Sequence, residues 1–456
     1  MRHDAHGYWL AETGAVTPTA PAAGDLEADA VIVGGGYTGL WTAWQLVERG
    51  ARVVLLEADL CGHGPSGRNG GFCETLWSNL PSLRERFDDV RALAACEASS
   101  DSVSAIGAWC EQEGVDAWFR RSGFLMASTS EAQDAVIDRI LAAAEIAPGR
   151  VVALDERALR ARCDSPRFRR GLLVPDDASV QPARLALGLR RRLLERGVAI
   201  HERSRVRALR VSPGEVVAET ASARVRGGAA VLALNAGTRG VRPLRSRLSV
   251  TSSHIVLTEP VPDVLERIGW TGGETITDGR TFVHYFRTTP DGRVAFGWGG
   301  GPLAWGARLD GRVEVDAATV AATRAHLVEM LPALAGRRIA HAWGGPIDVS
   351  PSHLPQIGTL EDGPVHYAFG YTGNGVGPSH LAGRTLASLV VGARAPVLLD
   401  HTPVRVPPEP LAWLGGVIVR RAFLRAERLE GAGRRPDPLT RAVCAAPRAL
   451  GIHVSR

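Results

Sequence analysis

A glycine-rich turn between two short apolar runs constrains this chain most. Residues 28–57 read ADAVIVGGGYTGLWTAWQLVERGARVVLLE, which predicts a strand, a tight turn, a helix and a second strand in one βαβ unit. Gly34 permits the turn, Gly36 lets a pyrophosphate approach bare backbone, and Gly39 lets the helix pack closely on the sheet. Glu57 ends the second strand, where a carboxylate accepts the ribose hydroxyls of an adenosine. Together these residues predict a dinucleotide site.

A second glycine-rich stretch follows directly after this unit. Residues 62–71 read GHGPSGRNGG, at the place where a nicotinamide dehydrogenase would begin another helix. Such a polar loop suits a large planar ring that needs backbone donors around it.

The runs VIVGGGYTGLWTA, LEA and PSGRNGGF resemble the amino end of flavin-dependent oxidoreductases of the D-amino-acid oxidase superfamily. Within it, the chain is most similar to the branch of amine oxidases that includes gamma-glutamylputrescine oxidase. The resemblance implies FAD as the cofactor. It also implies that the following residues lie beside the flavin: Ser66, Arg68, Asn69 and Gly70. Pro65 departs from the pattern, because alanine is usual there.

Two later stretches complete the implied FAD site. The run AAVLALNAGT ends at Asn235 and Gly237, and the resemblance implies that this strand returns beside the pyrophosphate while the backbone near Val206 faces the adenine. A second glycine loop contains Gly370, Gly373, Asn374 and Gly375. The N-terminus of the helix that follows would face the ring, where backbone N–H groups stabilise the anionic N1–C2=O locus. Ordinary strands and a structural turn explain the same residues locally.

These patterns predict an α/β fold in which a discontinuous Rossmann-type FAD-binding domain joins an α+β substrate domain built on an antiparallel sheet. Residues 74–147 have helical apolar spacing, whereas 247–301 alternate like strands around a hairpin turn. The expected boundaries are an N-terminal arm at 1–27 with Tyr8-Trp9-Leu10 as an apolar anchor, an FAD-binding domain at 28–85, 175–245 and 340–395, a substrate domain at 86–174 and 246–339, and a basic C-terminal tail at 396–456.

The substrate pocket is expected on strands of the second domain. TFVHYFRTT alternates aromatic and polar residues, so one face of this strand should reach the pocket. Its YFR run resembles a motif of the same branch. The candidate substrate-contacting side chains are His254, His284, Tyr285, Arg287 and Tyr371. Each histidine is equally explained as a satisfied strand residue. Arg287 either holds a carboxylate or phosphonate in a bidentate pair or pairs with a surface acid.

Cysteine and lysine usage bear on the cofactor chemistry. The six cysteines form no CxxC pair and have no histidine at metal-ligand spacing, so we expect reduced thiols and no metal site. Sarcosine oxidases tether their flavin through a later cysteine, and none lies here between Cys163 and Cys444, so we expect non-covalent FAD. All 53 basic residues are arginine. The lysine that activates oxygen in sarcosine oxidases is therefore absent, which leaves the electron acceptor as O2 or another carrier.

The basic charge is concentrated in the tail. The chain carries a formal net charge of +5, and residues 401–456 alone hold ten arginines against four acids. No nucleic-acid-binding motif accompanies this charge, so we expect no nucleic-acid partner. No apolar run is long enough to span a bilayer, and the amino terminus lacks a secretory signal, so we expect a cytoplasmic protein without a membrane role. Core packing or a dimer contact is expected of the tail helix, which leaves a homo-oligomer open.

The function predicted from these features is FAD-dependent oxidation of the C–N bond of an amine or amino acid, by hydride transfer to flavin N5 and hydrolysis of the imine. The substrate is a small amine. One alternative is an FAD-dependent 2-hydroxy-acid dehydrogenase, which needs a histidine base to take the hydroxyl proton. Another is a non-catalytic flavoprotein subunit, which predicts a blocked pocket.

Overall fold

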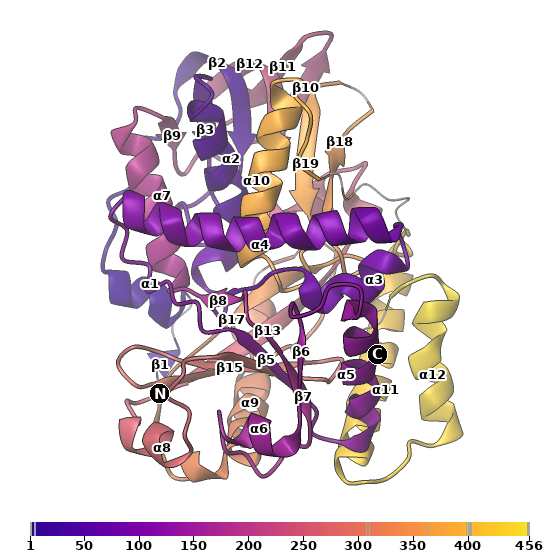
Figure 1. The fold of residues 1–456 in the computed structure, drawn as a ribbon. Helices are drawn as coiled ribbons and strands as arrows, with labels where there is room; N and C mark the ends of the chain where they lie inside the picture. Colours follow the sequence, from indigo (N-terminus) through magenta and orange to yellow (C-terminus); the bar gives the residue numbers. More distant parts are fainter. Residues whose placement is uncertain are drawn as a thin grey trace.

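Two large β-sheets, each assembled from strands that are distant in the sequence, organise the fold (Figure 1). The computed structural model describes residues 2–3, 6–306, 308–309, 311–361, 363–397, 399 and 404–453. The expected arm and tail therefore extend in part beyond the described residues. The α/β fold class predicted from the sequence is confirmed.

The first sheet carries the predicted βαβ unit. Its strands are β2 (Gly24–Val33), β3 (Val53–Leu56), β9 (Ala199–His201), β10 (Ala208–Ser212), β11 (Glu215–Glu219), β12 (Ala223–Leu232), β18 (Gln356–Thr359) and β19 (Val365–Phe369). The order is β10-β11-β12-β2-β3-β9, and β19 pairs with both β12 and β18. β2, β3, β9, β12 and β19 pair in parallel, whereas β10, β11 and β18 join antiparallel.

Both faces of this sheet are buried, which explains the continuous apolar run of β2. Ala30 and Ile32 pack toward a helical layer, while Val31 and Val33 belong to a separate cluster on the opposite face. The helical layer contains α2 (Tyr37–Val47), α7 (Pro182–Glu195) and α10 (Val376–Val390). α10 lies alongside α2, and in Figure 1 both run down the same side of the sheet.

The long helix α4 (Asp89–Gln112) lies elsewhere than its expected domain implies. We expected residues 86–174 in the substrate domain, but α4 runs across α2 and α10 (Figure 1). Ile106 and Trp109 share a buried cluster with Trp41 of α2. The apolar face of α4 is buried against the helices of the first sheet, and this burial determines where α4 lies. The domain boundaries themselves stay predictions.

The second sheet has nine strands in the order β1-β17-β13-β16-β15-β14-β5-β7-β6. They are β1 (Arg2–His3), β5 (Phe124–Ala127), β6 (Val152–Leu154), β7 (Gly171–Val174), β13 (Ser249–Thr258), β14 (Thr275–Asp278), β15 (His284–Thr288), β16 (Val294–Trp298) and β17 (Ile339–Val349). Only the β1/β17 and β14/β5 pairs are parallel. Residues 74–147 were expected to be helical, but they include the strand β5. The segment 340–395 begins within β17, which belongs to this second sheet.

Shorter elements connect and cover the two sheets. β4 (Phe72–Cys73) pairs antiparallel with β8 (Ala178–Ser179) between them. The remaining helices near the second sheet are α3 (Leu80–Arg84), α5 (Glu131–Ala144), α6 (Glu156–Arg160), α8 (Pro262–Arg267) and α9 (Ala317–Met330). The predicted hairpin turn joins β15 to β16, with Gly292 at φ +75°.

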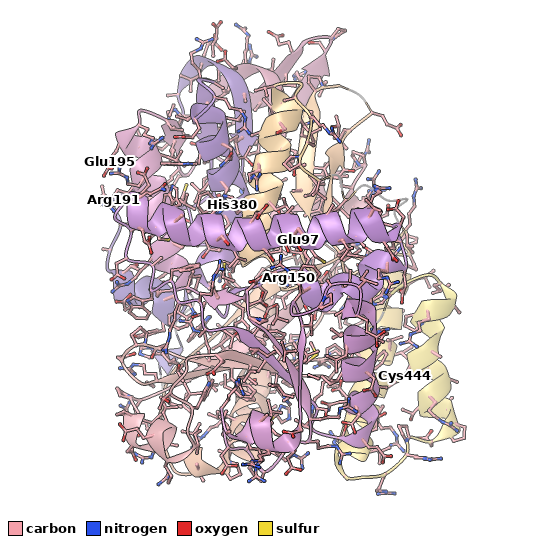
Figure 2. The ribbon with its side chains drawn as sticks, viewed as in Figure 1. Glu97, Arg150, Arg191, Glu195, His380 and Cys444 are labelled. Atoms are coloured by element: carbon pink, nitrogen blue, oxygen red, sulfur yellow. The ribbon has the colours of Figure 1, made fainter. Side chains whose placement is uncertain are left out.

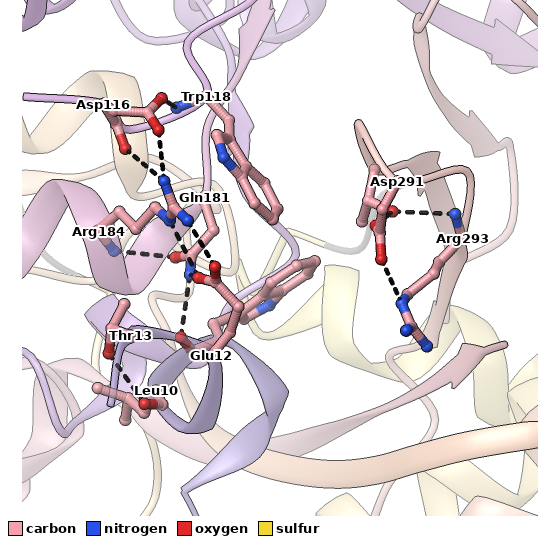
Figure 3. Close-up of polar contacts among 11 residues, drawn as sticks. Leu10, Glu12, Thr13, Asp116, Trp118, Gln181, Arg184, Asp291 and Arg293 are labelled. Atoms are coloured by element: carbon pink, nitrogen blue, oxygen red, sulfur yellow. Dashed lines mark hydrogen bonds and ion pairs between the residues drawn. The ribbon is translucent and has the colours of Figure 1, made fainter. Parts of the chain in front are cut away.

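The N-terminal arm is anchored by its helix α1 (Gly7–Thr13), and the predicted apolar anchor is confirmed, since Trp9 and Leu10 are buried. Figure 3 shows the polar contacts that fix this helix. The Gln181 amide donates to Trp9 O at 2.9 Å and to Glu12 Oε2 at 2.8 Å, and Arg184 Nε donates to Glu12 at 3.0 Å. The arm is therefore held against α7.

The tail forms two packed helices, α11 (Leu411–Gly431) and α12 (Pro438–Ala449). Phe423, Ala426 and Glu427 are its buried anchors, and Glu427 Oε1 accepts from the Thr281 and Phe282 backbone N–H groups at 2.9 and 3.2 Å. α11 is longer than the short tail helix that was expected from the sequence. Over the described ranges, no helix is both long and apolar enough to cross a bilayer.

Candidate FAD and substrate site

One continuous cavity of about 1150 Å³ lies between the two sheets. Ligand pockets typically measure roughly 300–1,000 Å³, so this cavity has room for a dinucleotide together with a small substrate. Most residues predicted from the sequence line it, and they are Gly34, Gly36, Glu57, Ser66, Arg68, Asn69, Gly70, Val206, Asn235, Gly237, Tyr285, Tyr371, Gly373, Asn374 and Gly375. Gly39, His254, His284, Arg287 and Gly370 do not line it.

The first glycine turn has the geometry that its sequence requires. Gly34 has φ +113°, and a Cβ there would lie 2.3 Å from Ala233 O. A Cβ at Gly39 would lie 1.9 Å from Gly34 O, so only glycine lets α2 start so close to β2. Gly36 caps α2 at the cavity wall, where a Cβ would approach Ser66 Oγ to 2.9 Å. The turn leaves bare backbone at the start of a helix, which suits a pyrophosphate.

Glu57 lies at the end of β3 and holds the turn in place. Its Oε2 accepts from Gly35 N at 2.7 Å and its Oε1 from Asp59 N at 2.8 Å. Burial raises the pKa of Glu57, although these backbone donors act against the rise. Each oxygen keeps a further lone pair, so the carboxylate can still accept ribose hydroxyls.

Two tryptophans fix the loop at 62–71, and neither contact was predicted from the sequence. Trp9 Nε1 donates to Asn69 O at 2.9 Å, and Trp343 Nε1 donates to Arg68 O at 2.8 Å. The Asn69 side chain closes the turn, since its Oδ1 accepts from Gly71 N at 2.7 Å. Because α1 and β17 supply these indoles, parts of the chain far from the βαβ unit determine the shape of the loop.

The second glycine loop rests on a buried acid that sequence reasoning missed. Asp348 of β17 is 1% exposed and lines the cavity. Its Oδ2 accepts from Gly370 N at 2.5 Å, and its backbone oxygen accepts from Thr372 N at 3.0 Å. Burial raises the pKa of Asp348 to about 7. The sequence signal that could have identified Asp348 is a single acid in a mostly apolar predicted strand.

The cavity contains orphaned polar atoms that fit a dinucleotide with a ribityl chain and a polar ring. Within the part of the chain that is described, Asn235 Oδ1 and Asn374 Oδ1 are buried without a hydrogen-bond partner. Both residues line the cavity, one beside each glycine loop. Unpaired buried acceptors are costly unless a ligand supplies donors. The residues present therefore fit FAD, and which of them touch it stays a prediction.

Tyr285 and Tyr371 are the candidate substrate residues that reach the cavity. Tyr285 Oη lies 2.6 Å from Ser253 Oγ, and its ring lies over Gly297, where a Cβ would be 2.0 Å from Tyr285 Cζ. The hydroxyls of Tyr371 and Thr38 lie 2.7 Å apart, so Tyr371 links the second glycine loop to α2. Burial raises the pKa of Tyr285 to about 12, and that of Tyr371 also rises.

The histidine candidates do not reach the cavity, which corrects the expectation from the sequence. His254 lies on β13 between Ser253 and Ile255, which do line it, so the strand's alternation turns His254 to the other face. There its Nε2 accepts from Asp316 N at 3.1 Å, and burial lowers its pKa to about 4. His284 Nδ1 lies 2.7 Å from Asp278 Oδ2, and its Nε2 lies 3.0 Å from His326 Nδ1.

Arg287 does not line this cavity either, and its guanidinium donates to backbone oxygens rather than to a surface acid. Its side chain is 2% exposed, and Nη1 donates to Gly71 O at 3.0 Å and Val180 O at 2.5 Å. Nε donates to Thr288 O at 3.3 Å. Burial lowers the pKa of Arg287 to about 10. It ties the end of the 62–71 loop to the strand pair β4/β8.

The cysteines fit the expectation of a non-covalent cofactor. Cys61, Cys73, Cys96, Cys110 and Cys163 are buried and Cys444 is half-buried. None of the six lines the cavity. Burial raises the pKa of Cys73, which keeps the thiol beside the loop neutral and unreactive.

Comparison with known proteins gives consistent matches. Residues 29–389 match the family model described as FAD dependent oxidoreductase. The chain is 28% identical over 397 residues to the gamma-glutamylputrescine oxidoreductase of Escherichia coli (strain K12), covering 86% of this chain and 90% of that protein. It is 28% identical over 419 residues to the probable oxidoreductase OrdL of Rhizobium meliloti (strain 1021), covering 88% and 90%.

Among solved structures, glycine oxidase from Geobacillus kaustophilus superposes with a TM-score of 0.68 at 20% identity, covering 83% of this chain and 99% of that one. Iminodiacetate oxidase from Chelativorans sp. BNC1 gives a TM-score of 0.66 at 20% identity, covering 82% and 98%. These likenesses establish the fold. Since the family model spans most of the chain and the cavity fits its cofactor, the protein belongs to the FAD-dependent oxidoreductase family.

Proposed function

We propose that this protein oxidises the C–N bond of a small amine or amino acid, releasing an imine that water hydrolyses. When bound, FAD supplies the hydride acceptor. The observation that carries the proposal is that a single cavity of about 1150 Å³ is lined both by Glu57 of the dinucleotide unit and by Tyr285 of the second sheet. A non-catalytic flavoprotein would not need this open path to the second sheet.

The positions of the histidines favour an amine over a 2-hydroxy acid. The hydroxy-acid alternative was expected to use a histidine base to take the hydroxyl proton, and such a base works best with a pKa near the operating pH. His254 and His284 lie outside the cavity. His353 lines it, but burial lowers its pKa to about 3, which makes it a weak base. A neutral amine needs no base at the moment of hydride loss.

The chain's own residues would bind and orient the amine. Ser253 and Tyr285 present oxygens to the cavity, and Ile255 and Trp343 supply apolar walls that exclude water. These groups suit an N–H donor beside an apolar carbon. O2 or another carrier then takes the electrons from the reduced flavin. The lysine-free sequence offers no ammonium group for oxygen activation.

The experiment is an anaerobic titration of the purified protein with a matched panel of amines, amino acids and 2-hydroxy acids. Bleaching of the yellow colour by a nitrogen compound, and not by its hydroxy analogue, is the expected result. Bleaching by the hydroxy acid alone would favour the alternative dehydrogenase. If no compound of any class bleaches the protein, the alternative of a non-catalytic flavoprotein subunit is favoured. Admitting air afterwards separates an oxidase, which recolours fast, from a dehydrogenase.

A further inference from the structure

Two acids lie directly beyond the strand pair β4/β8, and one of them lines the cavity. In this antiparallel pair Phe72 is opposite Ser179 and Cys73 is opposite Ala178, and Glu74 and Asp177 are the next residues of the two segments. Asp177 Oδ1 accepts from Thr75 N, and burial and the charge of Asp177 raise the pKa of Glu74, so the two carboxyls repel each other when both are ionised. Asp177 is 1% exposed and Glu74 is 8% exposed. Two negative charges in this position would both be poorly solvated.

Glu74 faces the cavity, whereas Asp177 lies behind it. Glu74 lines the cavity, and no described residue gives its carboxyl a hydrogen bond. Its backbone oxygen packs against the start of α10, because a Cβ at Gly377 would lie 2.2 Å from Glu74 O. Glu74 therefore lies between the 62–71 loop and the second glycine loop, which are the two segments predicted to hold the ring.

The surroundings of the pair contain little positive charge. Asp177 Oδ1 accepts from Thr75 N at 2.7 Å, which favours the ionised form on Asp177. Arg121 lowers the pKa of Asp177 from a distance, but its guanidinium donates to Ser104. Cys73 is neutral, and Asp176 adds further negative charge. Burial raises the pKa of Glu74 well above the usual carboxyl range, and that of Asp177 to about 7.

The residue next to the pair, Asp176, belongs to a polar network at the surface. Asp176 adjoins Asp177 in the chain, and its Oδ2 accepts from Ser100 Oγ at 2.9 Å and from Arg150 Nη1 at 2.8 Å. Arg150 also donates to Glu97 at 2.6 Å, and both side chains are partly exposed. Figure 2 shows Glu97 on α4 and Arg150 just beside it, on the face of the molecule toward the viewer. The segment that carries Asp177 is thereby held to α4 at the surface.

We propose that Glu74 and Asp177 carry one proton between them and exchange a proton with the substrate amine through Glu74. This inference rests on the proposed function. An amine arrives as R₂CH–NH₃⁺ and must become R₂CH–NH₂ before it can lose hydride. The Thr75 N–H favours the charge on Asp177, so the resident proton lies on Glu74. This proton first passes from Glu74 to Asp177; an N–H bond of the ammonium then breaks and an O–H bond forms on the Glu74 carboxylate. The pair passes from one proton and one negative charge to two protons and no charge, and nothing is oxidised or reduced.

The test compares Glu74→Gln and Asp177→Asn with the wild-type holoprotein. Glu274→Gln is the matched control, because Glu274 Oε2 is also buried without a partner among the described residues but Glu274 does not line the cavity. The first measurement is the urea midpoint as a function of pH, which needs no substrate. The wild-type midpoint should fall as pH rises through the pKa of the pair, because the native state retains a proton that the unfolded state has lost. The two pair variants should lack most of this fall, and Glu274→Gln should retain it.

The second measurement is the rate of anaerobic bleaching by an amine, followed against pH. In Glu74→Gln it should drop by about 100-fold and lose the break near the pKa of the pair, a size typical of a lost proton-transfer group. Glu74→Asp should restore part of the rate. A purely structural pair would change the urea midpoint without changing the pH profile, and that result would overturn proton exchange.

The outcomes separate this inference from the proposed function. An unchanged pH dependence of the urea midpoint in Glu74→Gln would refute the shared proton, whatever the substrate. If no amine bleaches the wild-type protein, the proposed function and the exchange role both fail, while the urea series still decides whether the pair carries one proton. Normal bleaching with equal profiles in wild type and Glu74→Gln would refute only the exchange.

Discussion

Tyr285 donates its phenolic proton to Ser253, whose oxygen lies 2.6 Å away, because the Ser253 hydroxyl donates its own proton to Trp298 O at 2.9 Å. The Tyr285 oxygen is thereby left as an acceptor at the cavity wall. Burial raises its pKa to about 12, which keeps it neutral at working pH. A fixed neutral acceptor suits the N–H of an amine and offers nothing to a carboxylate.

Tyr285→Phe tests this assignment. The variant should keep its FAD, and its rate of reduction by an amine should fall about fivefold, because one neutral hydrogen bond contributes roughly 1 kcal/mol. Ser253→Ala is the matched control, and its effect should be smaller, since the tyrosine oxygen remains in place. Stopped-flow absorbance under nitrogen measures both rates. A wild-type rate in Tyr285→Phe would contradict the assignment.

Gly36→Val tests the cofactor turn. A Cβ at this position would lie 2.9 Å from Ser66 Oγ, and the larger valine would occupy the approach of the pyrophosphate. The purified variant should contain less than about a tenth of the wild-type FAD. Gly415→Ala is the control, because a Cβ there meets nothing within 4 Å and the site is remote. Absorbance of released flavin gives the content, and a full complement in Gly36→Val would refute the turn assignment.

Asp348→Asn tests the acid beneath the second glycine loop. The folded-state pKa of Asp348 is raised to about 7 from an ordinary value near 3.8, so the native state holds a proton that the unfolded state has lost between these values. The free energy of unfolding should therefore fall as pH rises across this window, by up to about 4 kcal/mol. Asparagine does not titrate and can still accept from Gly370 N.

Urea unfolding at about pH 5 and about pH 8 measures the difference. The variant should lose less stability than wild type between the two conditions. An equal loss in both proteins would show that Asp348 ionises normally.

Arg287→Met tests the corrected role of this arginine. Removing the guanidinium leaves Gly71 O and Val180 O without their donor, so the variant should be destabilised by about 3 kcal/mol. Its affinity for an amine substrate should stay within about threefold of wild type, since that ratio corresponds to less than 1 kcal/mol. Arg52→Met is the control, because Arg52 pairs with Asp29 at the exposed surface and its loss should cost little. Selective loss of a carboxylate substrate in Arg287→Met, with normal stability, would contradict its placement.

The cofactor half of the site could be predicted from the sequence because its signals are local. Gly34, Gly36 and Gly39 are required by contacts within one βαβ unit, and their spacing alone specifies those contacts. The loop after Glu57 follows directly in the chain. The indoles of Trp9 and Trp343 could not be found this way, because each reaches the loop from a segment that only the tertiary fold brings near.

The substrate half depended on strand register, which the sequence leaves open. On β13 the cavity receives Ser253 and Ile255, so a difference of one residue excluded His254. On β15 Tyr285 and Arg287 share a face by alternation, yet only Tyr285 reaches the cavity, because the backbone at Gly71 and Val180 covers Arg287. Glu74 and Asp177 lie about a hundred residues apart, and only the β4/β8 register makes them neighbours.

The central claim is that nitrogen leaves the substrate carbon, and a single anaerobic turnover tests it most directly. Purified holoprotein is mixed with a slight excess of an amine that bleaches it, and the ammonia or amine and the carbonyl compound released are quantified against the flavin reduced. We predict one nitrogen compound and one carbonyl compound for each flavin. Reduction with no nitrogen released, or reduction by a 2-hydroxy acid alone, would contradict C–N oxidation.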